Sequence, residues 1–580
     1  MKFNFIKKTF LLVAPVILLS SCDFPFFEVT LSVSDNNSYF IGQSYAKYGQ
    51  GTPILSDSST ISDSILSDSF SFHDCVDPNG ESFDITDTFE KIGIYTFKVT
   101  YQNKYNAEYK IKVVSGAYVP DELTFVNSDI KTNYAPATGK QKMLVIPINL
   151  QPGTVTEYGY WNSTNLASIN DYYFGSKEST PNGWNSLKTY YETASLGNLN
   201  ITGMVSDVYS ETSSSLTMSA IDADRTYQSL FVLISRAVSW VENHYPNQNW
   251  SEYDTNSDGC IDSIHLITNY YAYDWNTPLW PHMYETKDTS GTHTKPVANV
   301  YSISALNHVS SARTSIHEQG HIFGLQDYYD YSDSGNSVRD YVGQADMQSH
   351  NVMDWNSYSK LSVGWTKPIV VDGKMSSTTV TLRPASLTGD CLLVPVPNTW
   401  NGSAFDEYML MELFTRDGNN KDDWYNWSGA LGTGGVRLYH VDSRIYGYNG
   451  SDVDANHAGL GGSLVDNVKT SNYEHFIVGA NNSYDASSYI SVPGFDDFQL
   501  LTLIQRGKVN TFGNSSSNKR HYLTREDLFI TGSAFTFNDY KSFFTKTSVA
   551  TTMDDGRTFP YTITFNEVTS SKATITITRN

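Results

Sequence analysis

The period of the hydrophobic pattern changes twice along the chain, and these changes limit the architectures that it can adopt. Apolar and polar side chains alternate in residues 23–116, most clearly at 95–101 and 109–113. Residues 118–370 combine such runs with segments of helical spacing, and alternation prevails again in residues 371–580. Alternation is typical of half-buried strands, whereas apolar positions three or four residues apart are typical of amphipathic helices. The pattern therefore predicts a multidomain chain with an α+β part between two β-rich parts.

The length and the composition agree with several domains. One hydrophobic core stops growing at about 250–300 residues, and this chain has 580 residues, of which 39% are hydrophobic. We predict a signal peptide at residues 1–21, an immunoglobulin-like β-sandwich at 22–117, an α+β domain at 118–370 and one or two β-rich domains at 371–580. The sandwich is predicted from GIYTFKVTY (93–101) and YKIKVV (109–114), which resemble the last hairpin of a bacterial immunoglobulin-like domain.

Individual helices and strands follow from the same spacing. Apolar positions predict helices at residues 184–195, 226–243 and 310–323. Apolar runs predict strands at 143–150, 200–205 and 263–271 in the α+β domain, and at 392–396, 407–413, 436–442, 561–568 and 573–578 beyond it. Pro147 lacks a backbone N–H, so it favours an edge position or a bend for the first of these strands.

The start of the chain carries an export signal. Lysines precede an apolar run at residues 10–19, which is too short to span a bilayer. The run ends in LSSC (19–22), which resembles the lipobox of bacterial lipoproteins, in which the cysteine becomes the lipidated N-terminus. An ordinary signal peptide with a chance cysteine is the alternative. We therefore expect a secreted protein that is lipid-anchored through Cys22, at the bacterial cell surface or at the periplasmic face of a membrane.

Charge and cysteine content limit the partners and the cross-links. The formal net charge of -22 repels phosphate backbones, which argues against nucleic acid as a partner. Cys75, Cys260 and Cys391 remain when Cys22 is lipidated, and they form an odd set spread along the chain. They do not indicate a disulfide framework.

The segment HEQGH (317–321) carries the most specific chemical signal in the chain. Residues four apart lie on one face of a helix, so the imidazoles of His317 and His321 can share one tetrahedral Zn²⁺. Glu318 lies about 100° around the helix from His317, where it can act as general base on a metal-activated water. Chance gives this pattern on the order of 0.01 times in such a chain. Two core histidines of an amphipathic helix are the structural alternative.

Gly324 and Asp327 favour the metal-binding interpretation. Glycine adopts a positive φ readily and ends a helix with a sharp turn, which lets Asp327 return to the ion. A carboxylate is a competent zinc ligand. In the alternative, Asp327 does not bind the ion and instead orients one of the ligand histidines. Other nearby candidates for the third ligand are Asp330, Asp346 and Asp354.

The pattern HExxHxxGxxD followed by a downstream Met resembles that of the metzincin-like clan, whose usual third ligand is His. The segments HEQGHIFGLQDYYD (317–330) and NVMDWNSYSKLSVGW (351–365) resemble the immune inhibitor A family of bacterial metallopeptidases. Three further segments are similar to elements of that family: WNSLKTYYETASLGNLNITGMV (184–205), EYMLMEL (407–413) and GGVRLYHVD (434–442). The resemblance covers roughly residues 140–445.

This resemblance implies a metzincin-like zinc metallopeptidase catalytic domain at residues 118–370, flanked by all-β sandwich domains. It implies that His317, His321 and Asp327 bind one zinc ion and that Glu318 is the general base. Met353 would be the Met-turn residue, which packs beneath the site without binding the ion.

The expected function is a zinc-dependent endopeptidase that hydrolyses peptide bonds of extracellular proteins. Its partners would be protein or peptide substrates, and a membrane through the lipid anchor alone. The alternative is a surface adhesin or glycan-binding lipoprotein with a vestigial protease domain. The β-rich parts and the 40 Tyr and 11 Trp residues favour that alternative, whereas the intact HExxH pattern argues against it.

A second metal-binding loop is predicted at DTNSDGCID (254–262). Its oxygen spacing and its turn glycine, Gly259, are those of a calcium loop, in which a bound Ca²⁺ would be structural. His265 stands where such a loop would end in Glu. A polar turn rich in Asp and Asn is the alternative. The candidate ligands are Asp254, Asn256, Asp258, the carbonyl of Cys260 and Asp262.

Overall fold

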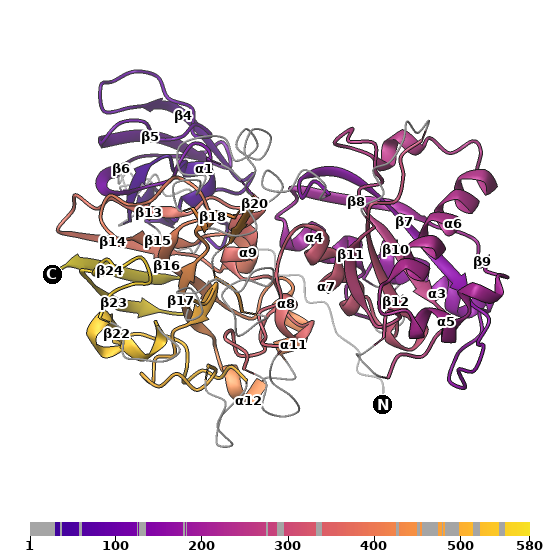
Figure 1. The fold of residues 1–580 in the computed structure, drawn as a ribbon. Helices are drawn as coiled ribbons and strands as arrows, with labels where there is room; N and C mark the ends of the chain where they lie inside the picture. The colour runs from indigo at the N-terminus through magenta and orange to yellow at the C-terminus, as the bar shows by residue number, and fades with distance from the viewer. Residues whose placement is uncertain are drawn as a thin grey trace, which may run out of the picture. The chain divides into compact units, whose positions relative to one another are not determined.

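The computed structural model describes the chain from residue 29 to residue 580, with several internal gaps. The described ranges are 29–34, 37–56, 61–124, 126, 135–177, 180, 183–273, 277–286, 295–331, 339–424, 428–448, 453–454, 474–477, 479–481, 498–513, 522–544 and 551–580. The predicted signal peptide and Cys22 lie outside the described residues. The fold is α+β with several sheets, as predicted at this level (Figure 1). Across the described ranges, no helix has the length and hydropathy needed to cross a membrane.

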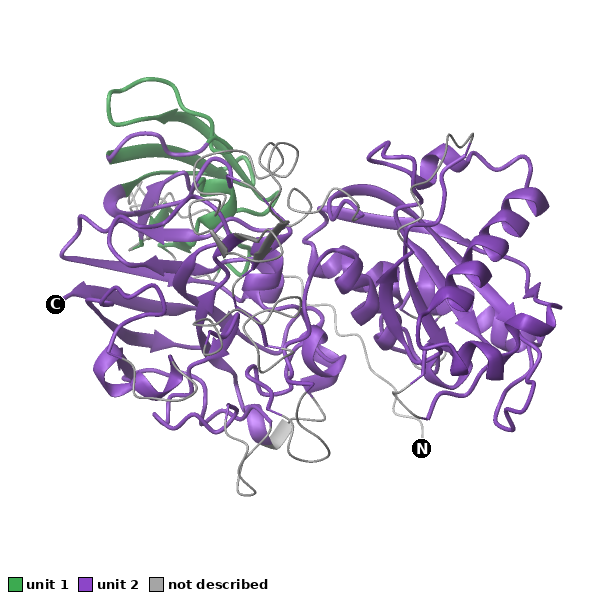
Figure 2. Cartoon of the chain, in the orientation of Figure 1, with its two compact units in different colours: residues 1–37, 44–87, 93–112 green, residues 38–43, 88–92, 113–580 purple. Residues whose placement is uncertain are grey.

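The chain forms two compact units (Figure 2). Unit 1 comprises Met1–Asn37, Ser44–Asp87 and Gly93–Lys112, and unit 2 comprises Ser38–Gln43, Thr88–Ile92 and Val113–Asn580. The domain boundaries predicted at residues 117 and 370 are not tested by this division and stay predictions.

Unit 1 is built from antiparallel strands, in agreement with its alternating sequence. β1 (Leu31–Ser34) pairs with β3 (Thr52–Leu55), and β4 (Phe70–Val76) pairs with β5 (Gly93–Tyr101). β5 leads through a tight turn into β6 (Tyr105–Tyr118), and both Gln102 and Asn103 in that turn have positive φ, as a two-residue hairpin requires. In the core, the ring of Phe97 stacks on Tyr45 of α1 (Tyr45–Tyr48) and on Tyr109.

The first sheet of unit 2 is mostly parallel. Its strand order is β11-β12-β10-β7-β8, and β9 also pairs with β7. β11 runs antiparallel to β12, and the remaining pairs are parallel. The strands are β7 (Gly139–Asn149), β8 (Leu199–Val205), β9 (Tyr209–Ser210), β10 (Ile264–Thr268), β11 (His282–Glu285) and β12 (Val300–Ala305).

Helices cover both faces of this sheet. Successive residues of a strand point to opposite faces, so Met143 and Val145 of β7 pack with α3 (Ser163–Phe174), α4 (Leu187–Ala194) and α7 (Arg313–Ile322). Leu144 and Ile146 pack on the other face with α5 (Met218–Ala223) and α6 (Gln228–His244). The predicted helices at 184–195, 226–243 and 310–323 are confirmed as α4, α6 and α7, with ends displaced by a few residues.

Pro147 is expected to favour an edge position or a bend. The edge position is wrong, because β7 lies between β10 and β8, and the bend stays a prediction. Pro147 pairs with Ile267 of β10 on one side. On the other side it falls between Val145, the last residue paired with β8, and Ile148, the first paired with β9. The missing N–H thus coincides with a gap between two neighbouring strands, which is where a sheet tolerates proline.

The rest of unit 2 is rich in β-structure. Strands pair in the order β21-β17-β16-β15-β13, and Ala117 and Tyr118 at the end of β6 pair with β13. A further sheet has the order β14-β24-β23-β22, and a small one has the order β19-β18-β20. The strands are β2 (Ser38–Ile41), β13 (Ile369–Val371), β14 (Ser377–Leu382), β15 (Leu392–Pro395), β16 (Glu407–Phe414), β17 (Gly435–Asp442), β18 (Ile445–Tyr448), β19 (Val453–Asp454), β20 (Glu474–Ile477), β21 (Leu501–Leu503), β22 (Ala534–Thr536), β23 (Tyr561–Val568) and β24 (Ala573–Arg579).

Short helices lie between α7 and β13 and between some of the later strands, although the sequence pattern predicts none beyond residue 323. They are α8 (Met347–His350), α9 (Ser357–Ser362), α10 (Ala385–Thr388), α11 (Asn420–Asp423) and α12 (Ser428–Leu431). One or two turns carry too few residues to show a helical period. The strands predicted at 392–396, 407–413, 436–442, 561–568 and 573–578 are confirmed as β15, β16, β17, β23 and β24.

Two adjacent residues of α6 test the packing of this helix on the sheet. Leu233 is fully buried against β7, whereas Val232 is 51% exposed. Leu233→Ala should lower the free energy of unfolding by about 2–5 kcal/mol, because it leaves a cavity. Val232→Ala should change it by less than about 0.5 kcal/mol. Urea unfolding followed by tryptophan fluorescence measures both, and equal effects would contradict the burial described.

Candidate metal centre

The end of α7 directs the chain back toward its own histidines. Gly324 follows the helix with a φ of 89°, a conformation that favours glycine. Its N–H donates to the carbonyl of His321 at 2.8 Å, and the N–H of Leu325 donates to the carbonyl of Gly320 at 3.1 Å. These two bonds close the helix in a Schellman motif. The predicted sharp turn at Gly324 is therefore confirmed.

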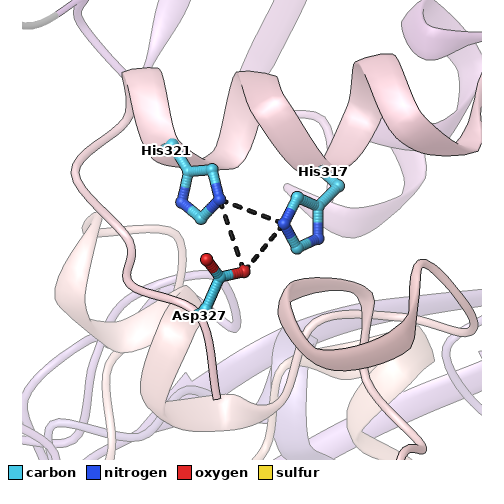
Figure 3. A group of neighbouring side chains, drawn as sticks. All are labelled: His317, His321 and Asp327. Carbon is cyan, nitrogen blue, oxygen red and sulfur yellow. Dashed lines mark hydrogen bonds and ion pairs between the residues drawn. The ribbon is translucent and has the colours of Figure 1, made fainter. Parts of the chain in front are cut away.

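Three side chains from this segment point toward one another (Figure 3). The Nε2 atoms of His317 and His321 lie 3.0 Å apart. Oδ1 of Asp327 lies 2.8 Å from Nε2 of His317 and 3.4 Å from Nε2 of His321. His317 and Asp327 are each 5% exposed, so the cluster is largely shielded from water.

The outer nitrogens of both imidazoles are held by backbone carbonyls. Nδ1 of His317 lies 2.8 Å from the carbonyl oxygen of Met347, and Nδ1 of His321 lies 2.8 Å from that of Leu325. A carbonyl can only accept, so each Nδ1 carries a proton and donates it. In the neutral imidazole the lone pair then lies on Nε2, facing the cluster, which is how metal-binding histidines are oriented.

The inner atoms of the cluster attract positive charge. Oδ1 of Asp327 is buried and faces the two Nε2 atoms, while the Tyr331 hydroxyl donates to Oδ2. Burial lowers the pKa of His321, but the charge of Asp327, helped by that of Glu318, raises it to about 10. The site therefore favours a cation at its centre.

The spacing of the three atoms fits a small metal ion. In a tetrahedral site with bonds of about 2.0–2.1 Å, the ligand atoms lie about 3.3 Å apart. The three observed separations are 2.8, 3.0 and 3.4 Å. Two imidazoles and one carboxylate form a donor set that suits Zn²⁺ and its first-row neighbours. His317, His321 and Asp327 could thus hold one such ion and leave a fourth position open.

Glu318 lies beside this cluster without being part of it. Its side chain is 6% exposed, and burial raises the pKa of its carboxyl, opposed by the charges of His317 and His321. Its own charge acts on both imidazoles. Such a carboxylate can accept a proton from a water molecule at the open position.

The other acidic residues considered for the third ligand have different partners. Asp330 faces Arg339 at 3.5 Å, and Asp354 lies 2.6 Å from Nζ of Lys360. Asp346 caps α8, where its carboxylate accepts a hydrogen bond from the N–H of Gln348 at 2.9 Å. Of these carboxylates, only Asp327 converges on the two histidines within the described residues.

Gln348 of α8 supports α7, and the sequence pattern does not predict this role. Nε2 of Gln348 donates to the carbonyl of His317 at 3.2 Å, and its Oε1 accepts a hydrogen bond from the Trp355 indole at 3.2 Å. Gly320 provides the space, since a Cβ there would lie 2.2 Å from Oε1 of Gln348. A glycine inside a helix, between the two histidines, is the signal that could have indicated this close approach.

A buried polar network supports the opposite side of α7. Oε1 of Gln319 accepts hydrogen bonds from the hydroxyl of Ser263 at 2.6 Å and from Nε2 of His265 at 2.9 Å. Burial lowers the pKa of His265 to about 4, so this imidazole is neutral and donates through Nε2. Its Nδ1 then accepts from the Tyr173 hydroxyl at 3.2 Å. His265 is thus a structural residue of β10.

Met353, the predicted Met-turn residue, lies in a tight turn. It is fully buried and has a φ of 62°, a conformation that non-glycine residues adopt rarely. Its N–H donates to Asp423 at 2.6 Å, and its carbonyl accepts from the Tyr190 hydroxyl at 3.0 Å. Asp423 also forms a bidentate ion pair with Arg313 at the start of α7. The turn and the helix are therefore joined, while the position of the Met353 side chain beneath the histidines stays a prediction.

The predicted calcium loop is closed by its own backbone. Asp254 accepts hydrogen bonds from the N–H groups of Asp258 and Gly259, both at 3.0 Å. Asp258 in turn accepts from the N–H of Cys260 at 2.8 Å, and Asp262 accepts from that of Thr255 at 3.0 Å. The amide of Asn256 donates to Asp258 at 2.9 Å. These bonds are those of a polar turn, and the calcium ion and its ligation by the Cys260 carbonyl stay predictions.

Comparisons with known proteins do not identify a family. No protein-family model matches the chain, and no curated protein matches it. The residues of the cluster and their geometry are therefore the basis for a functional proposal.

The close approach of α8 to α7 is tested by Gly320→Ala. The added Cβ should displace Gln348 from the His317 carbonyl and so disturb the orientation of that imidazole. We expect Zn²⁺ affinity to fall by about 10–100-fold, the usual effect of losing such support. Competition with a chromogenic chelator measures it. Gly507→Ala is the control, because no atom lies within 4 Å of a Cβ at that position, and an unchanged affinity in Gly320→Ala would contradict the support described.

The identity of the third ligand is tested by Asp327→Asn. An amide oxygen carries no charge, so Zn²⁺ affinity should fall by about tenfold or more. Asp330→Asn should leave the affinity near that of the wild type, since Asp330 pairs with Arg339. Zinc content after dialysis gives the comparison. A loss confined to Asp330→Asn would make Asp330 the ligand.

Proposed function

We propose that the chain is a zinc-dependent endopeptidase that hydrolyses peptide bonds of extracellular proteins. The observation that carries this proposal is the convergence of His317, His321 and Asp327 with Glu318 beside them. In the HExxH pattern, the two imidazoles bind the ion and the glutamate between them transfers protons. His317 and Asp327 are each 5% exposed and Glu318 is 6% exposed, so the cluster is shielded from most water.

The role of each residue follows from its surroundings. A bound Zn²⁺ would supply Lewis acidity, which polarises a peptide carbonyl and lowers the pKa of water. His317, His321 and Asp327 would hold that ion, with the imidazoles oriented by the carbonyls of Met347 and Leu325. Glu318 would accept the proton of the attacking water and pass it to the leaving amine. Tyr331 would hold the Asp327 carboxylate through its bond to Oδ2.

We further propose a metzincin-like core of the immune inhibitor A type, flanked by β-sandwich domains. The mostly parallel sheet with α7 on one face supports this proposal, as does the turn at Met353, which is joined to α7 through Asp423. The chain would reach the cell surface through its signal peptide and stay there through lipid on Cys22. The β-rich parts would keep the catalytic centre away from the membrane.

The proposal is tested by Glu318→Gln in the purified full chain. The substitution keeps the size of the side chain but removes the base, so cleavage of unfolded casein should fall by about 10²–10⁴-fold. Zinc content should match that of the wild type, because Glu318 is not a ligand. Glu192→Gln, on the exposed side of α4, is the control and should cleave like the wild type. A chelator should abolish cleavage, and added Zn²⁺ should restore it.

Two outcomes would contradict the proposal. Equal cleavage by wild type and Glu318→Gln would remove the proposed role of the glutamate. A wild type that binds no zinc and cleaves nothing would remove the peptidase itself. The second outcome would favour an adhesin or a glycan-binding lipoprotein.

A further inference from the structure

A second group of metal-ligating side chains lies in the β-rich part of unit 2. Glu407 begins β16, His440 lies in β17, and Asp554 lies in the segment that precedes β23. One ligand atom from each of the three lies within 4.8 Å of the others. Glu407 and His440 are each 1% exposed. None of these residues belongs to the elements that carry the first cluster.

The register of the sheet places the strand residues of this group on one face. Glu407 pairs with Asp442, and Met409 pairs with His440, which in turn pairs with Thr502 of β21. Side chains of directly paired residues lie on the same face, as do those of residues two apart along a strand. Glu407, His440 and Thr502 therefore project from the same side. The Thr502 hydroxyl is buried there and has no hydrogen-bond partner among the described residues.

The segment before β23 is fixed onto this face through its backbone. The N–H of Asp554 donates to Oε1 of Glu407 at 2.7 Å, and the N–H of Asp555 donates to Oε2 at 2.8 Å. Nε2 of His440 lies 2.8 Å from the same Oε1. These contacts bring Asp554 over the strands, yet its Oδ2 is buried and has no hydrogen-bond partner in the described part of the chain. Two buried polar atoms, on Asp554 and Thr502, are thus left unsatisfied, which is costly without a ligand.

The charges around the group do not balance. Asp442 forms a bidentate pair with Arg444 at 2.7 Å through each oxygen, and Asp555 pairs with Arg557. Among the described residues, four carboxylates therefore lie beside two guanidinium groups and the His440 imidazole. Such an excess of buried carboxylates over cationic groups favours a cation beside them.

We propose that Glu407, His440 and Asp554 bind a second divalent transition-metal ion, with the Thr502 hydroxyl as a further oxygen donor. Two carboxylates and a neutral imidazole balance the charge of such an ion. The imidazole favours Zn²⁺ or a neighbouring first-row metal over Ca²⁺, which prefers oxygen ligands alone. The ion would join β16, β17 and β21 to the segment before β23. Its role is structural, since a ligand set gathered from such distant parts of the chain stabilises their folded arrangement.

Metal content and thermal unfolding of the purified full chain test this proposal, with Zn²⁺ alone as the probe. After removal of metal and reloading, the wild type should hold two zinc ions, and His317→Ala/His321→Ala should hold one. Asp554→Asn in that double variant should remove the remaining ion. Zn²⁺ should raise the unfolding temperature of His317→Ala/His321→Ala but not that of the variant that also carries Asp554→Asn.

Two further variants keep the test decisive if Asp554→Asn folds poorly. Thr502→Val preserves shape and removes only the hydroxyl, so in the double variant it should weaken Zn²⁺ binding by about tenfold. Asp555→Asn is the matched control, because its side chain faces Arg557 and its N–H to Glu407 is kept. It should bind Zn²⁺ as before. A single ion in the wild type that disappears with His317→Ala/His321→Ala would overturn the proposal, and so would stabilisation by Zn²⁺ that survives Asp554→Asn.

Discussion

The first cluster depends on the two hydrogen bonds that tie the imidazoles to backbone carbonyls. Each bond fixes a proton on the outer nitrogen, and together they turn two lone pairs and a carboxylate oxygen toward one point. Three such atoms repel one another unless a positive charge lies between them. The surrounding structure therefore holds the cluster in an arrangement that an ion stabilises. The helix α7, the turn at Gly324 and α8 each help to hold the three side chains in place.

The support reaches α7 from three directions. Gln348 holds the His317 carbonyl, Gln319 is fixed by His265 of β10 and by Ser263 just before it, and Arg313 is paired with Asp423. Asp423 also holds the backbone of Met353, so the start of the helix and the tight turn share one carboxylate. The Arg313 guanidinium lies 3.9 Å from the centre of the Trp184 ring, which adds a contact from the segment before α4. A helix restrained in this way presents its histidines with little freedom.

Much of the first cluster could be predicted because its information is local. The spacing of His317 and His321, the glycine at 324 and the carboxylate at 327 each act within a few residues, and local rules describe them well. The same holds for long strands such as β5 and β16. The role of Gln348 and the joining of Asp423 to Arg313 could not be predicted, because they depend on contacts between segments far apart in sequence. Pro147 shows the reverse case. The local rule favoured an edge position or a bend, and β7 is not an edge strand, because the interruption between β8 and β9 accommodates the proline.

The two clusters differ in how far apart their ligands lie along the chain. His317, His321 and Asp327 come from one short stretch, so closing a loop among them costs little conformational entropy even in the unfolded chain. That stretch can bind an ion during synthesis, before the sheet forms. Because the ion then also binds the unfolded chain, it adds less stability to the folded state. Glu407, His440 and Asp554 come from three separate segments and meet only after those segments have folded together. The first cluster would therefore bind its metal while the chain is still being synthesised. The second cluster would bind metal only after the chain has folded.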